Sequence, residues 1–520
     1  MDTVNKYFSL SVRYAIRGIF AFAFLVAVGF LGWTSPLGLI IILVSFWLFR
    51  KAILAFGSTL FKFITQHKRA VMLVAIAFQI LLLFSARLLI RRDAAVVFTG
   101  AFHYLAEDLT VNYITRNPNN LFLFLYERLF FNLFHENGLW GMMGLNMLYV
   151  NASAYIIYAT AKRYGNQKIA DRCFFFFTFL FLFSPFFMSM YTDVLALPLL
   201  CLQTALALAL LQTNQKTQLL KNATLLGIVT GVTYFIRPTA LVLIIALFMI
   251  LGLNRYWKKG IIIFSLFLVS FGSIYAGGKY LESHQTEIQL LKGKGLAKSA
   301  LLFVDLGLTF SGTDQADMKA GLLQYVDESE RDNYNNGMFA TENIIKDIKR
   351  RLNDYTPVTF GAHLVVKLGA TLMDGSLGWT YFENPDDEKT PYVSPLYSYT
   401  KNNAFLKAVR RFWISSDTVE YQLSFLIRQI IWLIMIIGMI KATRFSFESN
   451  DFLLLALLGG LAFLMIFEGG KSRYLIQFIP QILLLAGRGW ENNALFPKIK
   501  GSIISVVGKS TVEIMEPFLV

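Results

Sequence analysis

The sequence predicts an all-α, polytopic membrane protein with about twelve transmembrane helices. Hydrophobic residues make up 56% of the chain and charged residues only 16%, whereas a soluble chain carries about 25% charged residues. The apolar residues gather in blocks of roughly 20, the length of helix that crosses the hydrocarbon core. The blocks lack the alternation of barrel strands, and an open sheet would leave its edge amides unpaired in lipid. The spans are therefore predicted to be helices.

The predicted spans lie within residues 1–490, which we interpret as one transmembrane domain that includes the segments between the spans. We place the spans at 14–33, 36–49, 71–90, 138–160, 173–190, 194–211, 222–236, 238–253, 260–278, 422–440, 452–467 and 474–488. Residues 491–520 form a tail after the last span.

The net charge of +15 is explained by membrane topology, and no nucleic-acid partner is expected. Lys and Arg collect in alternate segments between spans, and no basic run is interleaved with base-stacking aromatic residues. Basic segments stay on the cytoplasmic side, so both termini, including the tail, are predicted to be cytoplasmic in a multi-pass protein of the cell membrane. Residues 91–137 and 279–421 then become two extracytoplasmic segments.

Each of these outer segments is too polar to cross the bilayer but contains helical or aromatic patches. Residues 121–134 are apolar, although Glu127 and Arg128 interrupt them, and they are too short to span. This pattern is typical of a helix that lies in the outer membrane interface. Residues 50–69 are a candidate for its cytoplasmic counterpart.

Three sets of acidic residues lie on the predicted outer side. Asp93 follows the third span, where its carboxylate could accept a proton from a hydroxyl group; pairing with Arg91 or Arg92 is the alternative. Asp193 lies in a short outer turn, where a functional role and a helix N-cap are both open.

The third set, Glu107 and Asp108, follows His103 at a spacing that would place His103 and Glu107 on one helix face. Such a pair could contribute metal ligands. The sequence does not firmly imply a divalent metal or any other cofactor, and we assign no metal ligand.

Three cations lie on the outer side against the general distribution of charge. They are Arg237, Lys471 and Arg473. Cations kept there indicate an anionic partner, and the guanidinium group suits phosphate geometry; contact with lipid headgroups is the alternative. A carboxylate base beside phosphate-binding cations at lipid level would suit attack on a sugar linked to a lipid phosphate.

The order of these motifs resembles that of the GT-C superfamily of polytopic glycosyltransferases, which use polyprenyl-phosphate-linked sugars. The resemblance rests on Asp93, on residues 113–120, and on the motifs Tyr191-Thr192-Asp193, Ile236-Arg237-Pro238-Thr239 and Ser472-Arg473-Tyr474. Residues 303–308 and 373–379 are similar to segments of a Gram-positive bacterial branch of these proteins.

The resemblance implies sugar transfer at the extracytoplasmic face, with Asp93 in the catalytic position. Many members carry paired acids in the first outer loop, whereas Asp93 is single, so Glu107 and Asp108 remain secondary candidates together with Asp193. Arg237, Lys471 and Arg473 would bind the donor phosphate. The acceptor would be a glycan, lipid or protein of the cell envelope.

The main hypothesis is therefore a membrane glycosyltransferase that moves a sugar from a polyprenyl-phosphate donor to a cell-envelope acceptor. A transporter or flippase for lipid-linked saccharides would need charged groups in mid-span to line a path, and the predicted spans are nearly free of charge. A polymerase of envelope polysaccharide would share the lipid-phosphate site. The sequence does not distinguish it from the transferase, and it does not identify the sugar.

Overall fold

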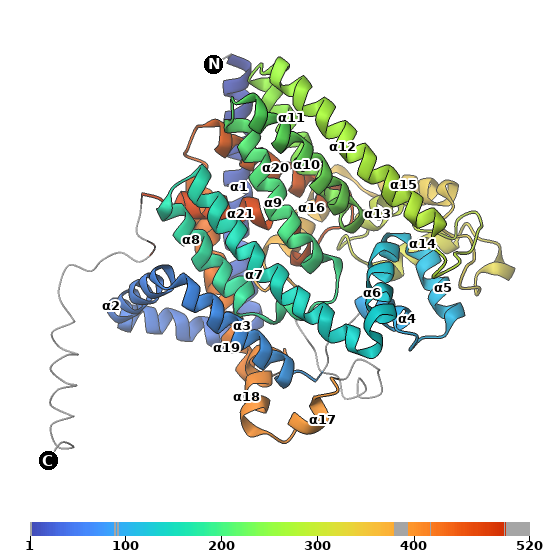
Figure 1. Cartoon of the computed structure of the whole chain (residues 1–520), viewed down its shortest axis with the longest axis horizontal. Helices are drawn as coiled ribbons and strands as arrows, with labels where there is room; N and C mark the ends of the chain where they lie inside the picture. The colour runs from blue at the N-terminus through green and yellow to red at the C-terminus, as the bar shows by residue number, and fades with distance from the viewer. Residues whose placement is uncertain are drawn as a thin grey trace.

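The computed structural model describes residues 3–87, 90, 93–378, 394–416, 418–492 and 495. Helices form the regular structure throughout these residues, which confirms the predicted all-α class. Figure 1 shows a bundle of long helices from which α4–α6 and α13–α15 extend together at one end.

Eight helices among the described residues are long and apolar enough to cross a membrane. They are α1 (Thr3–Thr34), α2 (Pro36–Gln66), α3 (Lys68–Ser85), α9 (Thr192–Gln212), α10 (Lys216–Ile236), α12 (Trp257–His284), α19 (Val419–Ala442) and α20 (Glu448–Ile466). This number does not confirm the prediction of about twelve spans.

The remaining predicted spans fall on helices that are shorter, broken or less apolar. These helices are α7 (Gly138–Tyr164), α8 (Gln167–Phe177) with the turns that follow it, α11 (Leu241–Leu253) after the turn Pro238–Ala240, and α21 (Ile479–Gly489) after the 3₁₀ segment η8 (Ser472–Phe478).

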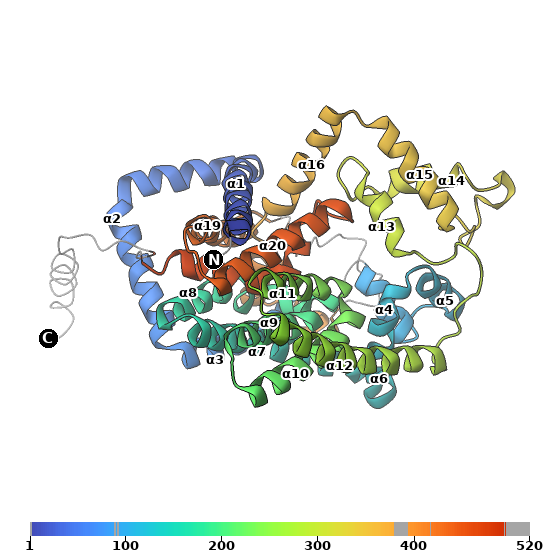
Figure 2. The same ribbon diagram turned by 90° about the horizontal axis from the view of Figure 1, so that it is seen from above.

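Helix α2 differs from the prediction because it joins the expected span 36–49 to the expected amphipathic segment 50–69. The helix bends at Phe49, whose φ of −113° and ψ of 22° are not helical, and Figure 2 shows the resulting corner. Arg50 and Lys51 marked a loop in the sequence, but both side chains are exposed and a helix accommodates them.

Helix α9 lies in the core, and polar side chains on its buried face are satisfied by neighbouring helices. Gln203 donates to Thr230 Oγ1 of α10 at 2.8 Å, and Gln481 of α21 donates to Thr204 Oγ1 at 3.2 Å. Hydrogen bonds between apolar helices fix how the helices align. They place the start of α9, the end of α10 and the start of η8 at the same end of the bundle.

The outer segments build a second body of structure beside that end. The first contains α4 (Asp93–Ala101), α5 (Glu107–Arg116) and α6 (Leu121–Phe134), and α6 has the bounds predicted for the interfacial helix. Its charged pair turns inward, since Glu127 and Arg128 are both buried. Arg128 donates to the Gly100 carbonyl of α4 at 3.0 Å, which ties the two helices together.

The second outer segment contains α13 (Ala300–Gly307), α14 (Gln315–Leu323), α15 (Thr341–Asp354) and α16 (Pro357–Leu372). The first three of these helices share a small apolar cluster. Beside it, Arg351 of α15 forms ion pairs with Asp347 at 2.8 Å, Asp305 at 3.2 Å and Asp317 at 2.5 Å. One guanidinium therefore holds α13, α14 and α15 together.

Replacing Arg351 with Leu should destabilise this outer body, because the buried Asp305 and Asp347 would lose a shared counter-charge. Removing one partner of a buried ion pair costs about 3–5 kcal/mol. Thermal unfolding of the detergent-solubilised chain should show the loss. Lys294→Leu is the control, because Lys294 pairs with Glu342 at the surface; an equal loss in both variants would contradict the assignment.

Candidate functional site

The buried carboxylate of Asp193 lies between two guanidinium groups at the outer end of the predicted topology. Asp193 is fully buried in the first turn of α9. Its Oδ1 forms a close ion pair with Arg237, and its Oδ2 lies 3.4 Å from Nε of Arg473. Arg237 directly follows α10, and Arg473 lies in η8. Three sequence-predicted site residues therefore meet, although their helices are far apart in the chain.

Two guanidinium groups on one carboxylate leave a net positive charge at this cluster, which we call the Asp193 clamp (Asp193, Arg237 and Arg473). The alternative that Asp193 caps α9 is wrong, because Tyr191 occupies the N-cap position. A buried carboxylate is stable only when it is paired. Asp193 therefore orients both arginines instead of accepting hydrogen bonds from the backbone amides at the start of α9.

The aromatic ring of Tyr191 packs against both arginines of the clamp. Its ring centroid lies 4.9 Å from Cζ of Arg473 and 5.7 Å from Cζ of Arg237, so both cations contact its π face. The Tyr191 hydroxyl is 3.5 Å from Oδ1 of Asn120, and Asn120 donates to the Tyr113 hydroxyl at 3.2 Å. The segment 113–120, which carries part of the family resemblance, thus reaches the clamp.

Asp93 begins α4 and its side chain is exposed. Burial is the main cause of the raised pKa of Tyr113, and the Asp93 carboxylate raises that pKa further. Asp93 also raises the pKa of Tyr191, where burial is again the larger cause. The Asp93 carboxylate is therefore within electrostatic reach of both tyrosines. Its alternative partners, Arg91 and Arg92, lie outside the described residues.

The other acids of the first outer segment do not join the clamp. Glu107 and Asp108 are exposed in the first turn of α5. Tyr113 lies near the other end of this helix, about 9 Å along the axis from Glu107.

The idea that His103 and Glu107 share a helix face is wrong, because α4 ends at Ala101 and α5 begins at Glu107. His103 has a φ of +58° in the turn between them and contacts Arg128. Within the described residues, no group of three or more His, Cys, Asp or Glu side chains could hold a metal ion.

Lys471 also lies apart from Asp193. Its side chain is 42% exposed and its Nζ is 3.6 Å from Glu468 in the same loop. An exposed pair of this kind contributes little energy. The structure therefore brings together two of the three predicted cations, Arg237 and Arg473, and leaves Lys471 at the surface.

Sequence reasoning missed Lys367, which holds the loop that carries Arg473. Lys367 of α16 is fully buried and donates to the carbonyls of Gly307 at 2.9 Å, Met465 at 2.9 Å and Phe467 at 2.7 Å. Burial lowers the pKa of Lys367 to about 8, so the amine keeps its three protons at neutral pH. A single lysine within an apolar helix has no sequence pattern that reveals such contacts.

The segment 373–378 packs against the clamp on another side. Oδ2 of Asp374 accepts a hydrogen bond from the Ser472 hydroxyl at 3.3 Å. Gly378 has a φ of +68°, and a Cβ there would lie 3.2 Å from Cβ of Arg473. A glycine at this position therefore allows the backbone to approach Arg473 closely. Trp379, the last residue of the sequence motif, lies outside the described residues.

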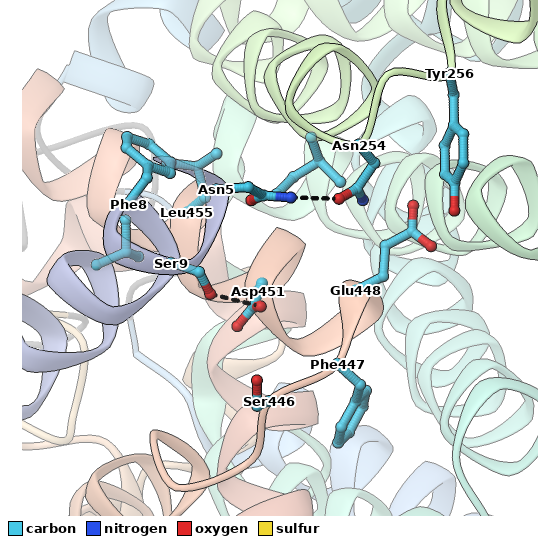
Figure 3. Close-up of a pocket in the computed structure, with 12 residues that line it drawn as sticks. Asn5, Phe8, Ser9, Asn254, Tyr256, Ser446, Phe447, Glu448, Asp451 and Leu455 are labelled. Carbon is cyan, nitrogen blue, oxygen red and sulfur yellow. Dashed lines mark hydrogen bonds between the residues drawn. The ribbon is translucent and has the colours of Figure 1, made fainter. Parts of the chain in front are cut away.

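A polar cavity of 180 Å³ lies at the other end of α20 from this loop (Figure 3). Asp451 accepts from Ser9 at 2.6 Å and from Arg13 at 2.9 Å, while Asn5 donates to Asn254 at 2.7 Å. The 19 residues of α20 separate this cavity from the clamp by about 28 Å. We interpret these bonds as ties between α1 and the ends of α11 and α20.

Replacing Lys367 with Met should loosen residues 467–472, because three buried or partly buried carbonyls would lose their donor. Each buried acceptor left unpaired costs about 1–3 kcal/mol. Hydrogen exchange followed by mass spectrometry should show faster exchange in that loop than in the wild type. Lys349→Met, on the exposed face of α15, is the control; unchanged exchange in the Lys367 variant would refute the role.

Comparison with known proteins gives one family and two solved structures. The model of a family described as "Conserved hypothetical integral membrane protein" matches residues 28–494. No curated protein matches. A structure of ArnT from Cupriavidus metallidurans bound to undecaprenyl phosphate is 13% identical, covers 82% of this chain and 77% of its own, and has a TM-score of 0.33.

The apo state of the same ArnT is 12% identical, covers 80% of this chain and 76% of its own, and has a TM-score of 0.30. Both TM-scores are low, so we infer function from the site itself.

Proposed function

We propose that this chain, which belongs to the family of conserved hypothetical integral membrane proteins, is a glycosyltransferase. It moves a sugar from a polyprenyl-phosphate donor to a cell-envelope acceptor at the extracytoplasmic face of the membrane. In this proposal the chain is a GT-C-like enzyme of the Gram-positive type that its motifs resemble. Residues 1–490 form its catalytic domain, and residues 491–520 are a cytoplasmic tail.

The observation that supports this proposal is the Asp193 clamp. Arg237 and Arg473 are fixed before any ligand arrives, because a buried carboxylate and the Tyr191 ring hold them. Preorganised cations stabilise charge that grows in a transition state without having to rearrange. Guanidinium groups at the end of membrane-spanning helices suit a phosphate attached to a lipid.

The proposed reaction uses Asp93 and the clamp. The Asp93 carboxylate takes the proton from an acceptor hydroxyl, and the acceptor oxygen forms a bond to the anomeric carbon. The bond between that carbon and the donor phosphate oxygen breaks, and its electrons stay with the lipid phosphate. Arg237 and Arg473 bind this phosphate while its negative charge increases.

A transporter for lipid-linked saccharides fits these observations less well. A transport path needs polar groups that are open to a substrate in mid-membrane. The amides of Gln203 and Gln481, at the centre of the described bundle, instead donate to neighbouring helices. The charged cluster lies at helix ends, which favours chemistry at one membrane face.

Replacing Asp93 with Asn should abolish transfer and leave donor binding intact, because the amide cannot take the proton but does not disturb the clamp. General base catalysis contributes about 10²- to 10⁴-fold. The measurements are transfer of labelled sugar in membrane vesicles that carry the purified chain, and retention of undecaprenyl phosphate by the chain in nanodiscs.

Two variants separate this role from a general disturbance of the site. Asp108→Asn changes an exposed acid at the far end of α5 and should transfer normally. Arg473→Met should lose lipid-phosphate retention as well as transfer. Full transfer by the Asp93 variant would refute the base assignment, and normal retention by the Arg473 variant would refute the clamp as the phosphate site.

A further inference from the structure

A second cationic group lies in the outer segments. We call it the Arg116 cluster, and it consists of two cations, Arg116 and Lys298, and the aromatic residues Tyr334 and Phe339. We propose that Arg116 and Lys298 bind a phosphate ester carried by the acceptor, and that this contact places the acceptor hydroxyl at Asp93. The inference rests on the proposed function and extends it to the chemical class of the acceptor.

Arg116 is held in one orientation by two aromatic rings. Its Cζ lies 4.8 Å from the ring centroid of Tyr334 and 4.8 Å from that of Phe339. Its Nη1 donates to the Tyr334 carbonyl at 3.3 Å. Phe339 is buried and Tyr334 is half exposed, so the guanidinium is fixed at the border between protein and water and keeps donors for a ligand.

Lys298 is brought to Arg116 by the backbone. Its amide donates to the Arg116 carbonyl at 3.0 Å, and its Nζ lies 6.0 Å from the Phe339 ring centroid. The preceding turn is fixed by two glycines: Gly295 has a φ of +72°, and a Cβ there would lie 2.1 Å from the Gly337 carbonyl oxygen. This contact needs glycine at position 295 and sets the position of Lys298.

The charges of the cluster are not balanced by a direct partner. Within the part of the chain that the structure describes, neither Arg116 nor Lys298 forms an ion pair with a carboxylate. Burial lowers the pKa of Lys298, the Arg116 charge lowers it further, and Asp93 and Glu468 oppose both effects. Two cations held together against their repulsion are stabilised when an anion binds between them.

The position of Asp93 connects this cluster to the reaction. Helices α4 and α5 pack side by side, because a Cβ on Gly100 would lie 2.6 Å from Thr110. Asp93 at the start of α4 therefore lies at the same end of this helix pair as Arg116 at the end of α5. The Asp93 charge reaches both the Arg116 cluster and the Asp193 clamp. The clamp lies at the ends of the bundle helices, whereas the Arg116 cluster lies on α5 and on the outer segment 279–421. The base thus serves two separate cationic sites, and the site away from the bundle suits the acceptor, which must present its hydroxyl to Asp93.

The test uses the full chain in nanodiscs and two probes, sn-glycerol 3-phosphate for the acceptor site and undecaprenyl phosphate for the donor site. The variants Arg116→Met and Lys298→Met should each weaken binding of sn-glycerol 3-phosphate by about tenfold or more, since each removes charged hydrogen bonds. Both should bind undecaprenyl phosphate as the wild type does, which also shows that they are folded. Lys294→Met is the matched control, because this neighbouring lysine is 76% exposed and pairs with Glu342.

Equal binding of sn-glycerol 3-phosphate by the wild type and both variants would overturn the inference. Displacement of that probe by undecaprenyl phosphate would also overturn it, because the probe would then occupy the Asp193 clamp. A wild type that binds no undecaprenyl phosphate, but binds sn-glycerol 3-phosphate through Arg116 and Lys298, would support the anion site and contradict the proposed donor.

Discussion

The Asp193 carboxylate is the interaction on which the site depends. It is fully buried, and it orients Arg237 and Arg473 from elements that meet only in the folded chain. Neither arginine could keep its position at an apolar helix end without this counter-charge, because an unpaired buried charge is strongly unfavourable. Two further residues help to hold these arginines in place. The Tyr191 ring packs against both guanidinium groups, and Lys367 binds the Phe467 carbonyl just before the loop of Arg473.

The polar groups that hold the bundle together lie apart from the charged groups of the proposed site. In mid-bundle, Gln203 and Gln481 donate to neighbouring helices and hold the bundle together. At the end of the bundle, charged groups gather from both outer segments and from the helix termini. Asp93 lies among them and acts on cations of the Asp193 clamp and of the Arg116 cluster. In the proposed reaction Asp93 is a base between two cationic sites, which fits the joining of two anionic substrates.

Apolar block length and charge placement predicted much of this arrangement. The helices, the bounds of α6, and the choice of Asp193, Arg237 and Arg473 as candidate site residues could be read from the sequence, because polar residues at span ends are costly. The ion pairs of Asp193 with both arginines could not, because they join elements that are far apart in the chain. The corner of α2 could not, since basic residues at its bend look like a loop. Lys471 was grouped with Arg473 because both are cations on the predicted outer side, and its pairing with Glu468 depends on the loop conformation. Lys298 and Lys367 gave no signal, because their partners are backbone carbonyls, aromatic rings and distant charges.

A cryo-electron microscopy map of the full chain in nanodiscs with undecaprenyl phosphate would test the central claim most directly. The account predicts density for the lipid phosphate within hydrogen-bonding distance of Arg237 and Arg473, with the Asp93 carboxylate facing the same space. A phosphate bound elsewhere, with Asp193 and its two arginines closed on one another and shielded from the lipid, would contradict it.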